Sequence, residues 1–272
     1  MPTRLSDPPD AVRVTLDDSQ RLRYSRHLLL DEWSEEAQER LQASHALVIG
    51  AGGLGAPALM YLASSGVGRI TVVDHDTVDL TNLQRQIAHT TERIGQPKVD
   101  SARQALAQLN PDVHVQALPQ VADEALLSTW VPQADVVLDC TDRFDTRHLI
   151  NRVCRQAGVP LVAAAAVRFD GQISVYDPRR PESPCYACLF PPDAPPEEAR
   201  CALLGVFAPL VGMMGVVQAG EAIKLLAGLD ADSASGQTPL AGRLLMVDGR
   251  SWQITSLAVR RDPGCPVCAG HP

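Results

Sequence analysis

The sequence predicts an α/β fold, with a mostly parallel sheet, helices on both of its faces and antiparallel strands towards the C-terminus. Two observations carry this prediction. Short apolar runs alternate with longer amphipathic segments between residues 45 and 166, as in successive strand–helix–strand units of a parallel sheet. After Arg168 the pattern changes, and "GQISVYD" (171–177) alternates between apolar and polar residues, as an antiparallel strand does.

The N-terminal region contributes a tail and two helices. Residues 1–19 are polar and rich in proline, and we expect a flexible tail there. We expect helices over "SQRLRYSRHLLL" (19–30) and "SEEAQERLQAS" (34–44). Ser34 is a good N-cap for the second helix, because its hydroxyl can accept a backbone N–H and two glutamates follow it.

The alternating region supplies the parallel sheet and its helices. Strands are expected at 45–50, 69–74, 113–118, 134–140 and 159–166. Helices are expected at 56–66, 98–110, 123–130 and 144–157. Glycine and proline end these helices, at Gly66 and Pro111 for example.

The rest of the chain adds a long loop, an apolar helix and two strands. A proline-rich loop (178–200) is of a length that is uncommon unless it is functional. The apolar run from Cys201 to Gly220 contains a proline and four glycines, so we expect a buried core helix, ending near Leu226, and no membrane span. A polar linker (230–242) then leads to strands at 243–248 and 252–259.

Composition restricts the partners and the compartment. The net charge of −8 over 272 residues gives no overall attraction for phosphate backbones, so no nucleic acid partner is expected. We find no secretory signal and expect a cytoplasmic protein, whose seven cysteines serve as thiols or metal ligands. Lys98 and Lys224 are the only lysines among 24 basic residues.

The glycine-rich turn after the first strand predicts a phosphate site. Gly50, Gly52 and Gly55 fit G-x-G-x-x-G between a strand and a helix, where backbone N–H groups can approach a phosphate. Asp74 ends the next strand, at the distance where an acid binds ribose hydroxyls. This Rossmann-like pattern fits NAD, FAD or ATP equally well.

Cations beyond the second strand favour a triphosphate. Asn82, Arg85 and Lys98 follow Asp74, and a guanidinium and an ammonium can neutralise charge on a departing pyrophosphate. The alternative is that Arg85 and Lys98 are solvated surface charges. Two further acids, Asp139 and Asp142, end another strand in "VVLDCTDR". Asp142 there can hold Mg²⁺ or, alternatively, cap the next helix.

The cysteines predict a structural zinc site. Two C-x-x-C pairs, far apart in the sequence, have the spacing of a four-thiolate zinc knuckle, and a redox role is the weaker alternative. The four predicted ligands are Cys185, Cys188, Cys265 and Cys268. Cys140 and Cys154 are expected in the core.

Several ordered motifs resemble those of one family. "RYSR" (23–26), "GAGGLG" (50–55), "DHDTVDLTNLQRQ" (74–86) with "GQPK" after it, and "DCTD" (139–142) look like the motifs of the MoeB/ThiF adenylyltransferases, bacterial relatives of ubiquitin-activating enzymes. The resemblance runs from about Gln20 to Gly270. It implies ATP, Mg²⁺, zinc and a ubiquitin-like sulfur carrier protein with a C-terminal Gly-Gly. It also implies a single adenylation domain over 20–272, with a nucleotide-binding half (20–166) and a half for the carrier and zinc (167–272).

The resemblance also assigns site residues. It implies catalytic roles for Arg26, Arg85, Lys98, Asp142 and Cys201. The implied nucleotide contacts are Gly50, Gly52, Gly53, Gly55, Asp74, Asp76, Thr81, Asn82, Leu83, Gln84, Arg85, Lys98 and Asp142. Arg26 would enter the site of a partner subunit, which implies a homodimer, and Cys201 matches a thiol that takes sulfur or links to the carrier. The family's usual residue after "DCTD" is Asn, whereas this chain has Arg143.

The implied reaction is adenylylation of the carrier's terminal glycine carboxylate, which gives an acyl-AMP and pyrophosphate. MoeB, of molybdenum cofactor synthesis, shares the core motifs, but three stretches look closer to ThiF, of thiamine thiazole synthesis: "RYSRHLLLDE" (23–32), "LNPDV" (109–113) and "RRDPGCPVC" (260–268). A separate protein is expected to donate the sulfur. Two hypotheses from other classes are an NAD-dependent dehydrogenase, which leaves Arg85 and Lys98 without a task, and a non-catalytic zinc scaffold.

Overall fold

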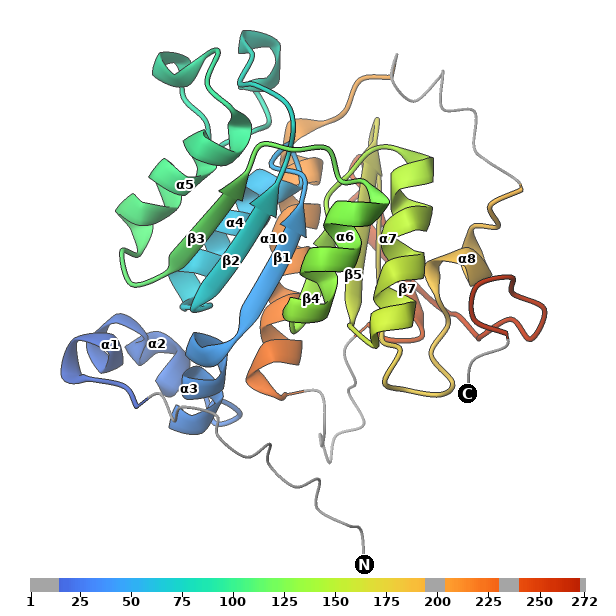
Figure 1. The fold of residues 1–272 in the computed structure, drawn as a ribbon, viewed down its shortest axis with the longest axis horizontal. Helices are drawn as coiled ribbons and strands as arrows, with labels where there is room; N and C mark the ends of the chain where they lie inside the picture. Colours follow the sequence, from blue (N-terminus) through green and yellow to red (C-terminus); the bar gives the residue numbers. More distant parts are fainter. Residues whose placement is uncertain (1–14, 194–203, 230–239, 270–272) are drawn as a thin grey trace, which may run out of the picture.

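The computed structural model describes residues 15–193, 204–229 and 240–269. They form one eight-stranded sheet in the order β3-β2-β1-β4-β5-β6-β7-β8, in which the first five strands are parallel and the last three are antiparallel to their neighbours (Figure 1). The strands are β1 (His45–Ile49), β2 (Arg69–Val73), β3 (His114–Leu118), β4 (Val136–Asp139), β5 (Leu161–Val167), β6 (Asp170–Tyr176), β7 (Arg243–Asp248) and β8 (Gln253–Ala258). The predicted fold class is confirmed, and every strand lies where the sequence predicts one.

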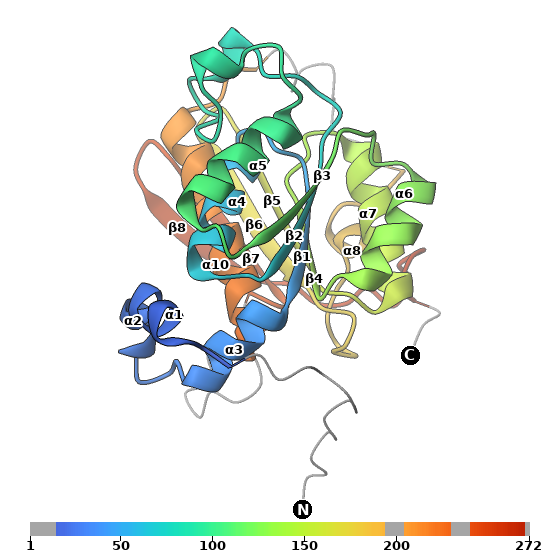
Figure 2. The same cartoon turned by 60° about the vertical axis from the view of Figure 1, so that its left-hand side comes forward.

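Helices cover both faces of the sheet, as Figure 2 shows. One face carries α3 (Glu35–Ala43), α4 (Gly55–Ser65), α5 (Lys98–Leu109) and α10 (Ala208–Ala227). The other carries α6 (Glu124–Trp130), α7 (Phe144–Ala157) and α8 (Tyr186–Leu189). The side chains of β1 alternate between the two resulting cores, with Ala46 and Val48 in one and Leu47 and Ile49 in the other. Both faces of the parallel strands are therefore buried, as their apolar sequences predict.

The N-terminal helix differs from the prediction. The segment expected as one helix is split into α1 (Asp18–Arg23) and α2 (Ser25–Leu28) at Tyr24. The Tyr24 hydroxyl accepts a hydrogen bond from Asn110 Nδ2 at 2.9 Å, and its ring lies against Gly66. A long-range contact thus fixes the break. Ser34 caps α3 as predicted, since its hydroxyl accepts the Ala37 N–H.

The apolar run forms a core helix, although α10 begins at Ala208, later than expected. Pro209 lies in its first turn, where the missing N–H does no harm. By length and composition α10 is the one helix in the described residues that could cross a membrane, but 67% of its apolar window is buried. It packs against α4 and β5. The tail predicted at 1–19 is described only from residue 15 onwards, and α1 begins within it.

Candidate functional site

The glycine turn between β1 and α4 lies at the carboxyl ends of the parallel strands. Gly50 has φ of +101°, and its N–H donates to the Val73 carbonyl at 2.8 Å. A Cβ at Gly55 would lie 1.9 Å from the Gly50 carbonyl oxygen, so only glycine fits there. The strand order reverses between β1 and β4, and such a switch point is where α/β sheets bind ligands.

Asp74 is fixed to this turn. Its Oδ2 accepts the Ala51 N–H at 2.8 Å, and its Oδ1 accepts the Asp76 N–H at 2.9 Å. The carboxylate therefore lies beside the glycine turn at the end of β2, in the position from which an acid can bind ribose hydroxyls.

Lys98 is buried and paired, so the alternative of a solvated surface charge is wrong for this residue. Only 5% of it is exposed, and its Nζ lies 2.8 Å from Asp76 Oδ2. The hydrogen bond from Lys98 is the main cause that lowers the pKa of Asp76. Since Asp76 is half-exposed while Lys98 opens α5, the pair holds an ammonium group near the glycine turn.

Arg85 lies over the glycine turn. Its Nη2 donates to Asn82 Oδ1 at 2.9 Å and its Nη1 to the Thr81 carbonyl at 3.3 Å. Its Cδ is 3.6 Å from the place that a Cβ on Gly53 would take. The guanidinium is therefore held by its own turn, with the Arg85 side chain passing beside Gly53. Leu83 is half-buried and Gln84 is exposed in the same turn.

The end of β4 reaches the same place. A Cβ at Gly50 would lie 2.8 Å from the Cys140 carbonyl oxygen. Asp142, two residues further on, is exposed. Arg143, not Asp142, occupies the N-cap of α7, without a capping side-chain bond. Asp142 is thus left facing solvent near the glycine turn, and a carboxylate there is a suitable Mg²⁺ ligand.

Arg26 does not belong to this group within one subunit. It lies exposed on α2, and the neighbouring Tyr24 and Arg23 contact the C-terminal ends of α4 and α5. The site lies at the N-termini of these helices, which have 11 and 12 residues, so the separation is about 16–18 Å at 1.5 Å per residue. Figure 1 places α2 at the end of the sheet away from the glycine turn.

Two buried residues that sequence reasoning missed support the site. His89 Nε2 lies 2.8 Å from the Ala51 carbonyl and its Nδ1 lies 2.9 Å from Ser101 Oγ. Burial lowers the pKa of His89, so a neutral ring donates to the glycine turn. Arg147 donates to the carbonyls of Thr141 and Ala164, which holds the loop before Asp142. The sequence did contain a sign that Arg147 is buried. Arg147 lies one turn after Phe144, on the same face of the predicted helix (144–157).

The four predicted zinc ligands form one cluster. Their ligand atoms all lie within 4.8 Å of one another. The Sγ–Sγ distances are 3.9 Å for Cys185–Cys188, 3.6 Å for Cys185–Cys265 and 3.5 Å for Cys188–Cys268. A tetrahedral ion with Zn–S bonds of about 2.3 Å places sulfurs about 3.8 Å apart, whereas a disulfide needs about 2.05 Å. The donor set therefore fits a closed four-thiolate zinc site.

The two other cysteines that the structure describes lie in the core, as predicted. Cys140 and Cys154 are buried, and burial raises the pKa of both thiols, which makes them unreactive core residues. Cys201 lies outside the described residues.

Known proteins resemble this chain over almost its whole length. The ThiF family pattern matches residues 24–267. The sulfur carrier protein ThiS adenylyltransferase of Escherichia coli (strain K12) is 48% identical over 255 residues, which cover 94% of this chain and 98% of that protein. The molybdopterin-synthase adenylyltransferase of the same organism is 43% identical over 256 residues, which cover 93% and 98%. The crystal structure of E. coli MccB with ATP has a TM-score of 0.78 at 24% identity, over 90% of this chain and 74% of that one, which concerns the fold alone.

Fold, site and relatives together define an enzyme of the adenylyltransferase class, built on an α/β nucleotide-binding core. The chain belongs to the ThiF family, as its ordered motifs predict. This membership favours nucleotidyl transfer over hydride transfer, and it agrees with the buried, paired Lys98 and the half-buried Arg85 beside the glycine turn.

Proposed function

We propose that this enzyme uses ATP to adenylylate the C-terminal glycine carboxylate of a ubiquitin-like sulfur carrier protein, and that the carrier is of the ThiS type. The observation that carries the proposal is the placement of Arg85 and of the Lys98–Asp76 pair beside the glycine turn, with Asp142 two residues beyond Cys140, whose carbonyl oxygen lies against Gly50. A nucleotide that only transfers hydride needs no such set of charges around its phosphates.

The chemistry follows from these charges. A carboxylate is a poor electrophile because its leaving group would be oxide. The ionised carrier carboxylate attacks the α-phosphorus of ATP, a carboxylate–phosphorus bond forms, and the bond to the β-phosphate oxygen breaks to release pyrophosphate. The nucleophile is already deprotonated, so positioning and charge neutralisation suffice. The acyl-AMP then has AMP as a good leaving group for a sulfur nucleophile.

Each site residue has a task in this scheme. Asp74 binds the ribose, the N–H groups of the glycine turn hold phosphate oxygens, and Arg85 and Lys98 face the charge that builds on pyrophosphate. Asp142 would hold Mg²⁺, which would neutralise negative charge on the phosphates. Asn82 orients Arg85 through the 2.9 Å hydrogen bond.

A second subunit completes the site in this proposal. Arg26 is too far from its own glycine turn, and it is surrounded by exposed leucines. Leu22 is 78% and Leu29 72% exposed, and such an apolar surface on a short helix pair suits burial against another copy. In a homodimer Arg26 enters the partner's site.

The carrier is assigned to the far edge of the sheet. β8 is the last strand in the sheet order, and all of its residues are exposed. Ile254, Leu257 and the adjoining Trp252 are 59%, 45% and 50% exposed. A strand edge with apolar side chains suits a small β-rich partner. The 48% identity to a ThiS adenylyltransferase, against 43% to a molybdopterin-synthase one, favours the ThiS type; a MoaD-type carrier is the second candidate.

The thiols have two roles in the proposal. The four-cysteine cluster binds a structural zinc ion with no open position. The Cys201 thiolate attacks the outer sulfur of a persulfide on a separate donor protein, whose thiolate leaves, or it attacks the carrier's acyl-AMP, which forms a thioester and releases AMP. Reduced thiols of both kinds suit the cytoplasm.

ATP–pyrophosphate exchange with ThiS-type and MoaD-type carriers tests the proposal. We expect exchange with the ThiS-type carrier only, and loss of exchange in Asp142→Ala. Exchange with the MoaD-type carrier alone would identify that carrier, the second candidate, as the substrate. Absence of exchange with either, although a carrier binds, would indicate a non-catalytic scaffold. A Cys201→Ser variant should exchange normally but fail to deliver sulfur.

A further inference from the structure

Asn151 joins α7 to the cysteine cluster. Only 2% of the residue is exposed. Its Oδ1 accepts the N–H of Tyr186, the residue after Cys185, at 2.9 Å. The amide is therefore held in one orientation, with its oxygen committed to the backbone of the first C-x-x-C pair.

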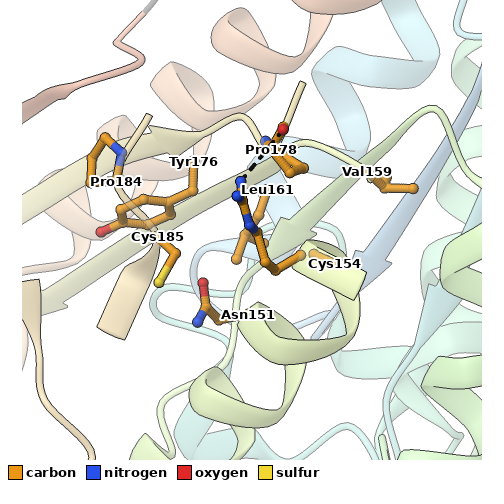
Figure 3. A pocket seen from close by; sticks show the side chains of 9 residues that line it. Asn151, Cys154, Val159, Leu161, Tyr176, Pro178, Pro184 and Cys185 are labelled. Carbon is orange, nitrogen blue, oxygen red and sulfur yellow. Dashed lines mark hydrogen bonds between the residues drawn. The ribbon is translucent and has the colours of Figure 1, made fainter. Parts of the chain in front are cut away.

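The other half of this amide is unsatisfied. Asn151 Nδ2 is buried and has no hydrogen-bond partner among the described residues. Both Asn151 and Cys185 line a small, mostly apolar pocket, and Figure 3 shows the amide extending towards the cysteine. A buried donor without a partner keeps the full cost of its lost hydration, so a partner for this N–H group is strongly favoured.

The Cys185 sulfur needs such a donor. Four thiolates around Zn²⁺ carry a net charge of about −2, which N–H groups near the sulfurs stabilise. In the described part of the chain two backbone N–H groups, those of Cys185 and Asp262, donate to Cys188 Sγ, each at 3.4 Å. The buried Cys185 sulfur faces one backbone N–H among the described residues, that of Cys188 in the first turn of α8, and so has fewer backbone donors than Cys188.

We propose that Asn151 is a positioning residue of the zinc site, whose Nδ2–H donates to the Cys185 sulfur when that sulfur is a zinc-bound thiolate. The inference rests on the proposed zinc ion. It gives one side chain two functions, since Oδ1 fixes the turn of the first cysteine pair while Nδ2 stabilises its sulfur. It also connects the zinc cluster to α7, the helix that follows the loop of Asp142.

Zinc affinity and a cobalt spectrum test the inference with Asn151→Asp. Aspartate keeps an oxygen for the Tyr186 N–H, loses the N–H donor and adds a negative charge near the sulfurs. We expect a 10–100-fold loss of zinc affinity in competition with a chromogenic chelator, the usual effect of removing such an outer contact. In the cobalt-substituted protein we expect the sulfur-to-metal charge-transfer band to move to longer wavelength. Asn151→Ser, which removes the amide without adding a charge, should shift both readouts in the same direction and serves if the first variant does not fold.

Asn110→Asp is the matched control. Asn110 is equally buried, and its Nδ2 donates to Tyr24 Oη at 2.9 Å and to the Ala63 carbonyl at 2.8 Å, far from the cysteines. It should lower stability and leave zinc affinity and the cobalt band unchanged. An equal loss of zinc in this control would overturn the specific role of Asn151. Wild-type affinity and spectrum in both Asn151 variants would also overturn it, and would indicate that the amide bonds to water. Wild-type protein without zinc would instead overturn the zinc proposal.

Discussion

The two lysines of the chain allow stability and catalysis to be separated. Each lysine pairs with an acid, Lys98 with Asp76 and Lys224 with Glu221. The two pairs differ in which member, the lysine or the acid, is buried. Lys98 is buried and its acid is half-exposed, whereas Glu221 is buried and Lys224 is nearly half-exposed. The two substitutions Lys98→Met and Lys224→Met therefore have opposite consequences.

Lys98→Met should act on the reaction. Asp76 can return to water when its partner is lost, and methionine fills the buried space without a charge to desolvate. The loss of stability should be about 1 kcal/mol or less after allowance for solvent screening. The loss of a fixed cation beside the phosphates should slow ATP–pyrophosphate exchange about 10²–10³-fold, as removal of one preorganised charge-stabilising group typically does.

Lys224→Met should act on stability. It leaves Glu221 buried, with the Leu240 N–H as a remaining donor at 3.0 Å, so the expected cost is about 1–3 kcal/mol. Exchange by the folded enzyme should be unchanged, since α10 ends away from the glycine turn. Urea unfolding and exchange assays on both variants give the comparison. Equal exchange rates in Lys98→Met and wild type, or a rate loss in Lys224→Met as large as in Lys98→Met, would refute the reasoning.

Three further predictions concern the dimer, the metal and pH. Mixed at equal amounts, inactive Arg26→Ala and Asp142→Ala enzymes should regain about a quarter of wild-type exchange, because half of the randomly formed dimers have one intact site; no regain would place Arg26 outside the partner's site. Removal of zinc with a mercurial reagent should release one ion per chain and expose the segment around Cys265 and Cys268 to proteases, while nucleotide binding persists, as measured by calorimetry. Burial lowers the pKa of His45, His89 and His148, so the unfolded chain binds more protons below about pH 6.5 and stability should fall as pH decreases through that range. His89→Gln should reduce this slope in urea unfolding at pH 7.5 and 5.5, and an unchanged slope would count against a neutral His89.

The sheet was predictable because its signals are local. Apolar runs such as "HALVI" and the glycines after them depend on near neighbours alone, and the two C-x-x-C pairs carry their chemistry in their spacing. The break at Tyr24 was not predictable, since Asn110 and Gly66 cause it from distant parts of the chain. The same holds for His89, whose task is set by the Ala51 carbonyl. The burial of Lys98 likewise depends on the fold of the segment around Asp76.

The cysteine cluster has a consequence for the order of folding. Cys185 and Cys265 are 80 residues apart. Closing a loop of that length lowers the conformational entropy of the unfolded chain by the equivalent of about 4–5 kcal/mol of free energy. On the ribosome the second cysteine pair emerges long after β1 to β5, so those strands and the glycine turn can assemble first. If the cluster binds zinc as proposed, metal binding would come late in folding and would fix the C-terminal strands to a nucleotide-binding fold that has already formed.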